Sequence, residues 1–192
     1  MTGIGGSVFL NVPYDPGYES KFVALISTVV AAGLTPRCAL EIPERGEGQL
    51  KRVLEMIRDC PLSIHDLSRR HRPNMPFELG VAVAFKFAQP GGDRGFILLD
   101  ARAGRLVREF SDLRGIDPII HGNGPLMLIG GLLERLDGMH PGKVERMYRE
   151  LLRVLPALKK SHRAPHVFQR KVFQELVSGA LELATGAGLL TA

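Results

Sequence analysis

A single glutamate, Glu78, stands in the apolar stretch "NMPFELGVAVA" (residues 74–84), and its carboxyl group is the first candidate for chemistry. A carboxylate can attack a sugar carbon, or stabilise it electrostatically, as that carbon becomes oxocarbenium-like. The structural alternative is a helix start, with Asn74 or Met75 as the N-cap, Pro76 in the first turn and Glu78 favoured by the helix dipole. Burial would raise the pKa of Glu78 and the dipole would lower it, so both interpretations stay open.

Two apolar runs end in further polar side chains. His65 and Asp66 end the run "PLSIHDL" (61–67), and Asn11 lies in "SVFLNVP" (7–13), directly before Tyr14 and Asp15. Asp66 and Asn11 are candidates for holding a nucleobase or ribose hydroxyls. A turn explains Asp66 and Asp15 equally well, because Asp favours turns, and His65 can be a hydrogen-bonded packing residue.

The loop that follows, "SRRHRPN" (68–74), is rich in hydrogen-bond donors. Ser68 and Asn74 can bind a base or sugar, and Arg69, Arg70 and Arg72 can bind phosphate through their forked guanidinium groups. The alternative is a solvated loop.

Metal and cofactor motifs are missing from the sequence. The six histidines show no metal-binding spacing, and the three glycine-rich stretches (2–7, 45–52 and 121–131) fit neither nucleotide fingerprint. We therefore expect no metal and no cofactor, with a nucleotide only as substrate. Cys38 and Cys60 lie next to apolar segments and are expected to be buried, inert thiols in a reducing compartment.

Strand and helix patterns alternate over the first 121 residues. Strands are predicted at 7–13, 34–42, 61–67, 94–100 and 117–121, and helices at 19–33, 49–60 and 75–88. Such alternation predicts an α/β fold: a flavodoxin-like parallel five-stranded sheet in the order 2-1-3-4-5, with helices on both faces. Ligands of such sheets bind beyond the carboxyl ends of the strands, where the order reverses. We therefore expect "NVPYD" and "HDLS" to face each other across a cleft.

Beyond residue 122 the pattern becomes helical, with helices predicted at 125–136, at 143–155 up to Pro156, and at 167–184. The expected organisation is an α/β domain at 1–125 and a C-terminal helical extension at 126–192. These helices would cover the sheet or form a homo-oligomer contact.

Charge is unevenly distributed along the chain. The formal net charge is +5, but residues 143–171 hold nine Lys or Arg against two Glu, a net +7, which leaves −2 for all other residues. This segment is either a solvated helical face or a binding surface for an acidic partner or nucleic acid. The absence of Trp and the 6% aromatic content argue against a base-stacking surface. With no export signal and no uncharged apolar run of membrane-spanning length, we expect a cytoplasmic protein with no membrane partner.

The residues 78–82, Glu-Leu-Gly-Val-Ala, resemble the E-x-G-x-A signature of nucleoside 2-deoxyribosyltransferases, and the block "VFLNVPYD…SIHDLSR…NMPFELG" resembles bacterial TIR-like proteins. The resemblance covers about residues 7 to 121. In these families the glutamate on the helix after the third strand attacks or supports the anomeric carbon, and an aspartate ending that strand helps hold the base. The resemblance thus implies that Glu78 and Asp66 are the catalytic residues.

The implied function is cleavage of an N-glycosidic bond in NAD or a related nucleotide. In this interpretation Asn11, His65 and Asn74 help hold the substrate, together with Tyr14, Asp15, Ser68 and Arg69. Two alternatives stay open. One is base exchange of the nucleoside 2-deoxyribosyltransferase type. The other is a non-catalytic nucleotide-binding or protein-interaction module in bacterial defence or signalling, in which Glu78 only caps its helix.

Overall fold

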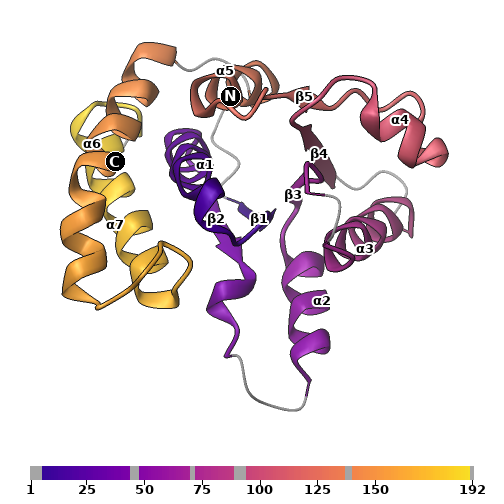
Figure 1. Ribbon diagram of the computed structural model, residues 1–192, viewed down its shortest axis with the longest axis horizontal. Helices are drawn as coiled ribbons and strands as arrows, with labels where there is room; N and C mark the ends of the chain where they lie inside the picture. Colours follow the sequence, from indigo (N-terminus) through magenta and orange to yellow (C-terminus); the bar gives the residue numbers. More distant parts are fainter. Residues whose placement is uncertain (1–5, 44–47, 70–71, 89–93, 137–139, 191–192) are drawn as a thin grey trace. The chain divides into compact units, whose positions relative to one another are not determined.

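The computed structural model describes residues 6–43, 48–69, 72–88, 94–136 and 140–190. Its five strands form one parallel sheet in the order β2-β1-β3-β4-β5, which confirms the predicted flavodoxin-like α/β fold (Figure 1). The strands are β1 (Ser7–Asn11), β2 (Thr35–Cys38), β3 (Leu62–Asp66), β4 (Gly95–Asp100) and β5 (Ile119–Ile120).

The helices lie close to their predicted positions. They are α1 (Glu19–Ala31), α2 (Gln49–Asp59), α3 (Asn74–Ala88), α4 (Arg105–Glu109), α5 (Pro125–Arg135), α6 (Pro141–Ser161) and α7 (Arg170–Gly186). Short 3-10 turns occur at η1 (Pro16–Tyr18), η2 (Ala39–Glu41) and η3 (Ser111–Leu113). The short α4 and the turns carry no long apolar periodicity, so the sequence did not indicate them.

The chain forms two compact units. One contains residues 14–36 and 123–192, and the other contains residues 6–13 and 37–122. Although α1 is distant in sequence from the C-terminal helices, it belongs to the same unit as α5, α6 and α7. The expected boundary between residues 125 and 126 stays a prediction.

In the first unit, α1 is the central helix. It packs against α5, α6 and α7, and its side chains from Lys21 to Ala31 are buried. The ring of Phe22 contacts those of Phe168 and Phe173, with centroids 5.4 and 5.8 Å apart. Glu19 links α1 to α6 and to the segment before α7. It accepts hydrogen bonds from Lys159 Nζ at 2.9 Å and from the N–H of Val167 at 2.9 Å.

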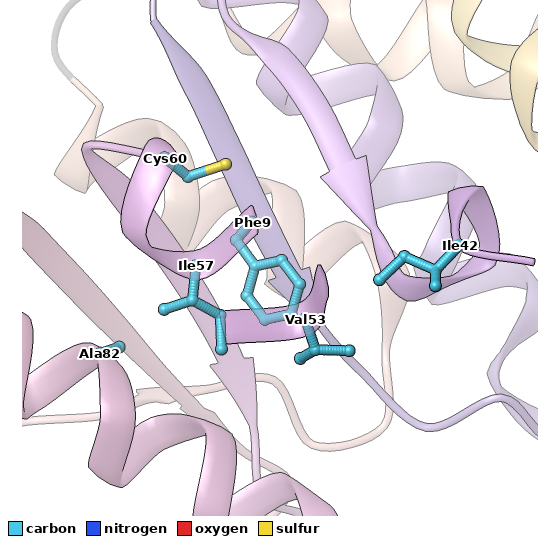
Figure 2. Packing of buried hydrophobic residues seen from close by; sticks show 6 residues of the cluster. All are labelled: Phe9, Ile42, Val53, Ile57, Cys60 and Ala82. Carbon is cyan, nitrogen blue, oxygen red and sulfur yellow. The ribbon is translucent and has the colours of Figure 1, made fainter. Parts of the chain in front are cut away.

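In the second unit, the core lies between the sheet and helices α2 and α3. Figure 2 shows Phe9 of β1 surrounded by side chains from α2, α3 and the connecting segments, namely Ile42, Val53, Ile57, Cys60 and Ala82. A second cluster joins α3 to β4 and α4 through Leu67, Met75, Leu79, Leu98 and Leu106. Cys38 and Cys60 are both buried in the thiol form, which confirms their predicted burial. Burial raises the pKa of Cys60, which keeps this thiol protonated.

The prediction that Pro156 ends its helix is wrong, because α6 continues to Ser161 with Pro156 inside it. Proline removes one helical hydrogen bond and normally kinks or stops a helix. Here the apolar stripe of α6, which includes the buried Leu151 and Leu155, belongs to a helix that packs against α1 and α7, and beyond Pro156 the side chain of Lys159 binds Glu19 of α1. Tertiary packing therefore outweighs the local penalty.

Among the helices in the described ranges, none is long and apolar enough to cross a membrane.

Candidate active site

A buried chain of hydrogen bonds joins β1 and β3. Asn11 and His65 are register partners on these strands, and Nδ2 of Asn11 lies 3.0 Å from Nδ1 of His65. On the other side of the ring, Nε2 of His65 lies 2.8 Å from Oγ of Ser63. Ser63 and His65 are two residues apart on one strand, so both side chains leave the same face of the sheet.

The hydrogen bonds define the state of the His65 ring. Complete burial lowers the pKa of His65 to about 3, so the imidazole is neutral at neutral pH. The amide nitrogen of Asn11 can only donate, so Nδ1 of His65 accepts and Nε2 carries the hydrogen. Nε2–H then donates to the Ser63 hydroxyl.

Asn11 also anchors the first turn of α3. Its second amide hydrogen is donated to the backbone carbonyl oxygen of Met75, with Nδ2 and O 2.8 Å apart. Met75 is the second residue of α3. One side chain therefore fixes the beginning of this helix to the ends of two neighbouring strands.

Glu78 projects from the buried side of the same helix. Met75, Glu78 and Ala82 follow each other at helical spacing and are all buried, with Glu78 9% exposed. Burial raises the pKa of Glu78 to about 7, and a hydrogen bond with the Asn74 side chain opposes this rise. Near neutral pH the carboxyl group is therefore divided between its protonated and ionised forms.

The structure does not support Glu78 as a helix cap. α3 begins at Asn74, so Glu78 is its fifth residue, and the first turn contains no acidic side chain. The expected helix start, with an N-cap at Asn74 or Met75 and Glu78 in the first turn, is wrong by one or two residues. Because the effect of the helix dipole falls off within the first turn, it does not account for this glutamate.

Asp66 lies on the opposite face of the sheet from His65, because neighbouring strand residues alternate. Its Oδ1 accepts the N–H of Ser68 at 2.9 Å, and its Oδ2 lies 3.1 Å from Nε2 of His121. Both Asp66 and His121 are fully buried. Of the predicted site residues, Asn11 and His65 therefore lie together at the beginning of α3. Asp66 instead contacts His121 on the other face of the sheet.

His121 was not a candidate from the sequence. It directly follows β5, and its N–H donates to the carbonyl oxygen of Asp100 at 3.0 Å. The only available signal was that "DPIIH", like "SIHD", ends an apolar run with a polar side chain. Which strand ends meet is decided by sheet register, which the sequence does not show.

A buried ion pair between Arg105 and Asp100 lies at the same edge of the sheet. The Arg105 guanidinium contacts both carboxylate oxygens of Asp100 at 3.0 to 3.1 Å, and it also donates to the carbonyl oxygen of Leu67. Asp100 ends β4, and Leu67 directly follows β3. Arg105 therefore fixes the segment that carries Ser68.

The polar loop after β3 is the accessible part of this region. Ser68 is half-buried, and Arg69, Arg72 and Asn74 are exposed. Arg70 lies outside the described residues.

Tyr14 and Asp15 belong to the other compact unit. The Tyr14 ring contacts those of Phe22 and Phe168, with centroids 6.3 and 5.4 Å apart. The carbonyl oxygen of Asp15 accepts the N–H of Tyr18 at 2.8 Å, which is the turn role foreseen for it. The expected approach of "NVPYD" to "HDLS" stays a prediction.

Part of the basic segment 143–171 is paired within the chain. Arg149 and Arg153 form exposed ion pairs with Glu145 and Glu150, and Lys159 binds Glu19 of α1. Exposed pairs of this kind contribute little to stability, whereas Lys159 joins two packed helices. An acidic or nucleic-acid partner for this segment stays a prediction.

Within the described ranges, no group of three or more His, Cys, Asp or Glu side chains is placed to hold a metal ion. Comparisons with family models, with curated proteins and with solved structures find no match to this chain.

Proposed function

We propose that this protein cleaves an N-glycosidic bond in NAD or a related nucleotide, with Glu78 as the reacting carboxylate. The observation that carries the proposal is the buried Glu78 side chain, whose pKa is raised to about 7, on a helix hydrogen-bonded to the end of β1. Perturbed carboxyl groups of this kind are typical of functional sites. The reversal of strand order between β1 and β3 supports a ligand site at the same end of the sheet.

In the proposed reaction, the bond between C1′ of the ribose and the nicotinamide nitrogen breaks. The bonding electron pair leaves with nicotinamide, which departs as a neutral base and needs no proton. Positive charge then develops at C1′, where the Glu78 carboxylate stabilises it or forms an ester. A water oxygen next bonds to C1′ and releases a proton, which gives ADP-ribose and frees the carboxylate.

Burial suits Glu78 to this role. A carboxylate with few water contacts gains more from an approaching positive charge than a solvated one, because the surroundings screen the attraction less. In this proposal Asn11 and His65 are positioning residues, since both are buried and their hydrogen bonds hold the start of α3. Asp66 acts through the Ser68 loop, and the exposed Arg69 and Asn74 contact the nucleotide.

The same pKa favours a second candidate function. A glutamate that is half protonated near neutral pH can donate a proton to a departing base, which a deoxyribonucleoside requires and NAD does not. Base exchange would then pass the sugar to a second base. The two functions differ in their products, because hydrolysis of NAD releases free nicotinamide and exchange yields a new nucleoside.

The test is chromatographic detection of nicotinamide and ADP-ribose from NAD, and of exchanged base from a deoxyribonucleoside pair. We expect product with the wild-type protein and none with Glu78→Gln. Glu55→Gln is the matched control, since Glu55 lies on α2 with a partly exposed side chain that forms an ion pair with Lys51. Unchanged turnover in Glu78→Gln would overturn the proposal. Nucleotide binding without product in the wild type would favour a non-catalytic module.

A further inference from the structure

Helix α3 has apolar side chains on nearly all sides. Of its fifteen residues, only Asn74, Glu78 and Lys86 are polar. The side turned away from the core exposes two aromatic rings, with Phe77 52% and Phe87 72% exposed. A surface helix normally presents a polar face to water, and exposed apolar patches mark interaction sites.

The exposed residues Phe77, Gly80, Ala84 and Phe87, here termed the α3 outer face, form a symmetric pattern. Their spacings are three, four and three residues, so they lie on one side of the helix and are symmetric about position 82. In a two-fold contact, residue i meets residue j and j meets i. An antiparallel pair of α3 helices would therefore place Phe77 against Phe87 of a second copy, and Gly80 against its Ala84.

We propose that the α3 outer face binds the same face of a second copy of this chain in this antiparallel arrangement. The two small residues allow close approach of the helices. A Cβ atom added at Gly80 would meet nothing within 4 Å, so the space above it is open. Beside Gly80 lies a groove of about 330 Å³ between α3 and the α4–η3 segment, lined by Pro76, Leu79, Val83, Phe110 and Leu113. Since a cavity of roughly 150 Å³ accepts a benzene ring, this groove has room for the ring of Phe87 from the second copy.

Charge complementarity supports a second copy as the occupant. Glu109 and Asp112 line the same groove, and both are exposed. Lys86 is exposed on the side of α3 that faces β4, with its Nζ 5.1 Å from the centre of the Phe96 ring. In the antiparallel pair, a two-fold axis perpendicular to the helices places the β4-facing sides of the two α3 helices on the same side of the dimer. Along the helix axis, Lys86 of one copy then lies opposite residue 78 of the other copy. This position is near the groove of that other copy, which Glu109 and Asp112 line.

The exposed area predicts a reversible dimer. With roughly 200 Å² for a phenylalanine side chain, the two rings expose about 250 Å² per copy and about 500 Å² per pair. Stable complexes bury at least about 1,200 Å² in total, and weak ones bury less. The association should therefore depend on protein concentration.

The experiment is sedimentation velocity of the full chain from nanomolar to high micromolar concentration. We expect a monomer–dimer equilibrium in the wild type and a monomer for Phe87→Ser, while Leu50→Ser, which changes another exposed apolar side chain, on α2, leaves the equilibrium unchanged. Gly80→Leu should also be monomeric, although it adds apolar surface, because the leucine fills the space between the helices. Replacing a mid-helix glycine favours the helix, and circular dichroism checks that this variant folds.

A charge exchange tests the register. Asp112→Lys alone should weaken the dimer by at least about tenfold, and Asp112→Lys combined with Lys86→Glu should restore it. A wild type that is monomeric at every concentration would overturn the proposal. Gly80→Leu that associates as well as the wild type would also overturn it, because it would reveal unspecific apolar association.

Discussion

Asn11 and His65 are neighbours in the sheet register, and Nδ2 of Asn11 lies 3.0 Å from Nδ1 of His65. The same amide group donates to the carbonyl oxygen of Met75, so one side chain links two strands to the helix that carries Glu78. If Glu78 is the reacting group, the position of its helix depends on Asn11.

We predict that Asn11→Ala lowers the free energy of unfolding by about 1–3 kcal/mol, because it leaves buried acceptors on His65 and Met75 without their donor. Urea unfolding measures the change, and Gln49→Ala, at an exposed amide, serves as the control. Asn11→Asp should be worse, since a carboxylate would face the Met75 carbonyl. A cost of only a few tenths of a kcal/mol for Asn11→Ala would contradict the anchoring role.

Glu78 should make the folded protein less stable as pH rises. Its pKa is about 7 in the folded chain and about 4.5 when exposed, so between these values only the folded state still holds the proton. Stability is therefore lost through this window, by roughly 3 kcal/mol at its upper end. We predict that Glu78→Gln is more stable than the wild type at about pH 8 and similar to it at about pH 4.5. Equal differences at both pH values would contradict the raised pKa of Glu78.

His65 should have the opposite effect at acidic pH. Its pKa is about 3 in the folded chain against 6.5 when exposed, so stability is lost as pH falls from 6.5 towards 3. At about pH 4 the loss is on the order of 3 kcal/mol. We predict that in His65→Gln the free energy of unfolding falls less between pH 6.5 and about pH 4 than in the wild type, as measured by chemical unfolding at a series of pH values. The comparison should be made in the Glu78→Gln background, with His65 or with His65→Gln. Otherwise Glu78 would change stability in the opposite sense over part of the same pH range. An equal loss of unfolding free energy at acidic pH in both proteins would show that His65 is not the group responsible.

Asp66 and His121 should be energetically coupled. We predict a coupling free energy of about 1–2 kcal/mol in a double-mutant cycle of Asp66→Ala and His121→Ala, because their polar atoms lie 3.1 Å apart in a buried site. A cycle between Asp66 and Glu41 is the control, since Glu41 binds Arg37 and the N–H of Cys38 instead. Additive effects for Asp66 and His121 would contradict the pairing.

Much of the sheet could be predicted because each strand is a short apolar run bounded by turn residues. Alternation with helices and the handedness of parallel connections leave few topologies, and the expected order among them was 2-1-3-4-5. Helix ends were less predictable. Pro156 should have ended α6 on local grounds, but the helix packs against α1 and α7 and continues to Ser161.

The candidate site was predictable only in part. The sequence indicated that Asn11, His65 and Asp66 end neighbouring strands, but not which face each side chain takes. Register places His65 beside Asn11 and leaves Asp66 on the opposite face, where it meets His121. The balance between dipole and burial at Glu78 was also undecided, because it depends on the residue at which α3 begins.

The most direct test of Glu78 as the reacting carboxylate is kcat/KM for NAD cleavage as a function of pH. Only the ionised carboxylate can attack C1′ or stabilise its positive charge, so we predict that kcat/KM rises with pH and levels off above a pKa of about 7. A profile that is flat across this range, or that falls as Glu78 ionises, would contradict the assignment.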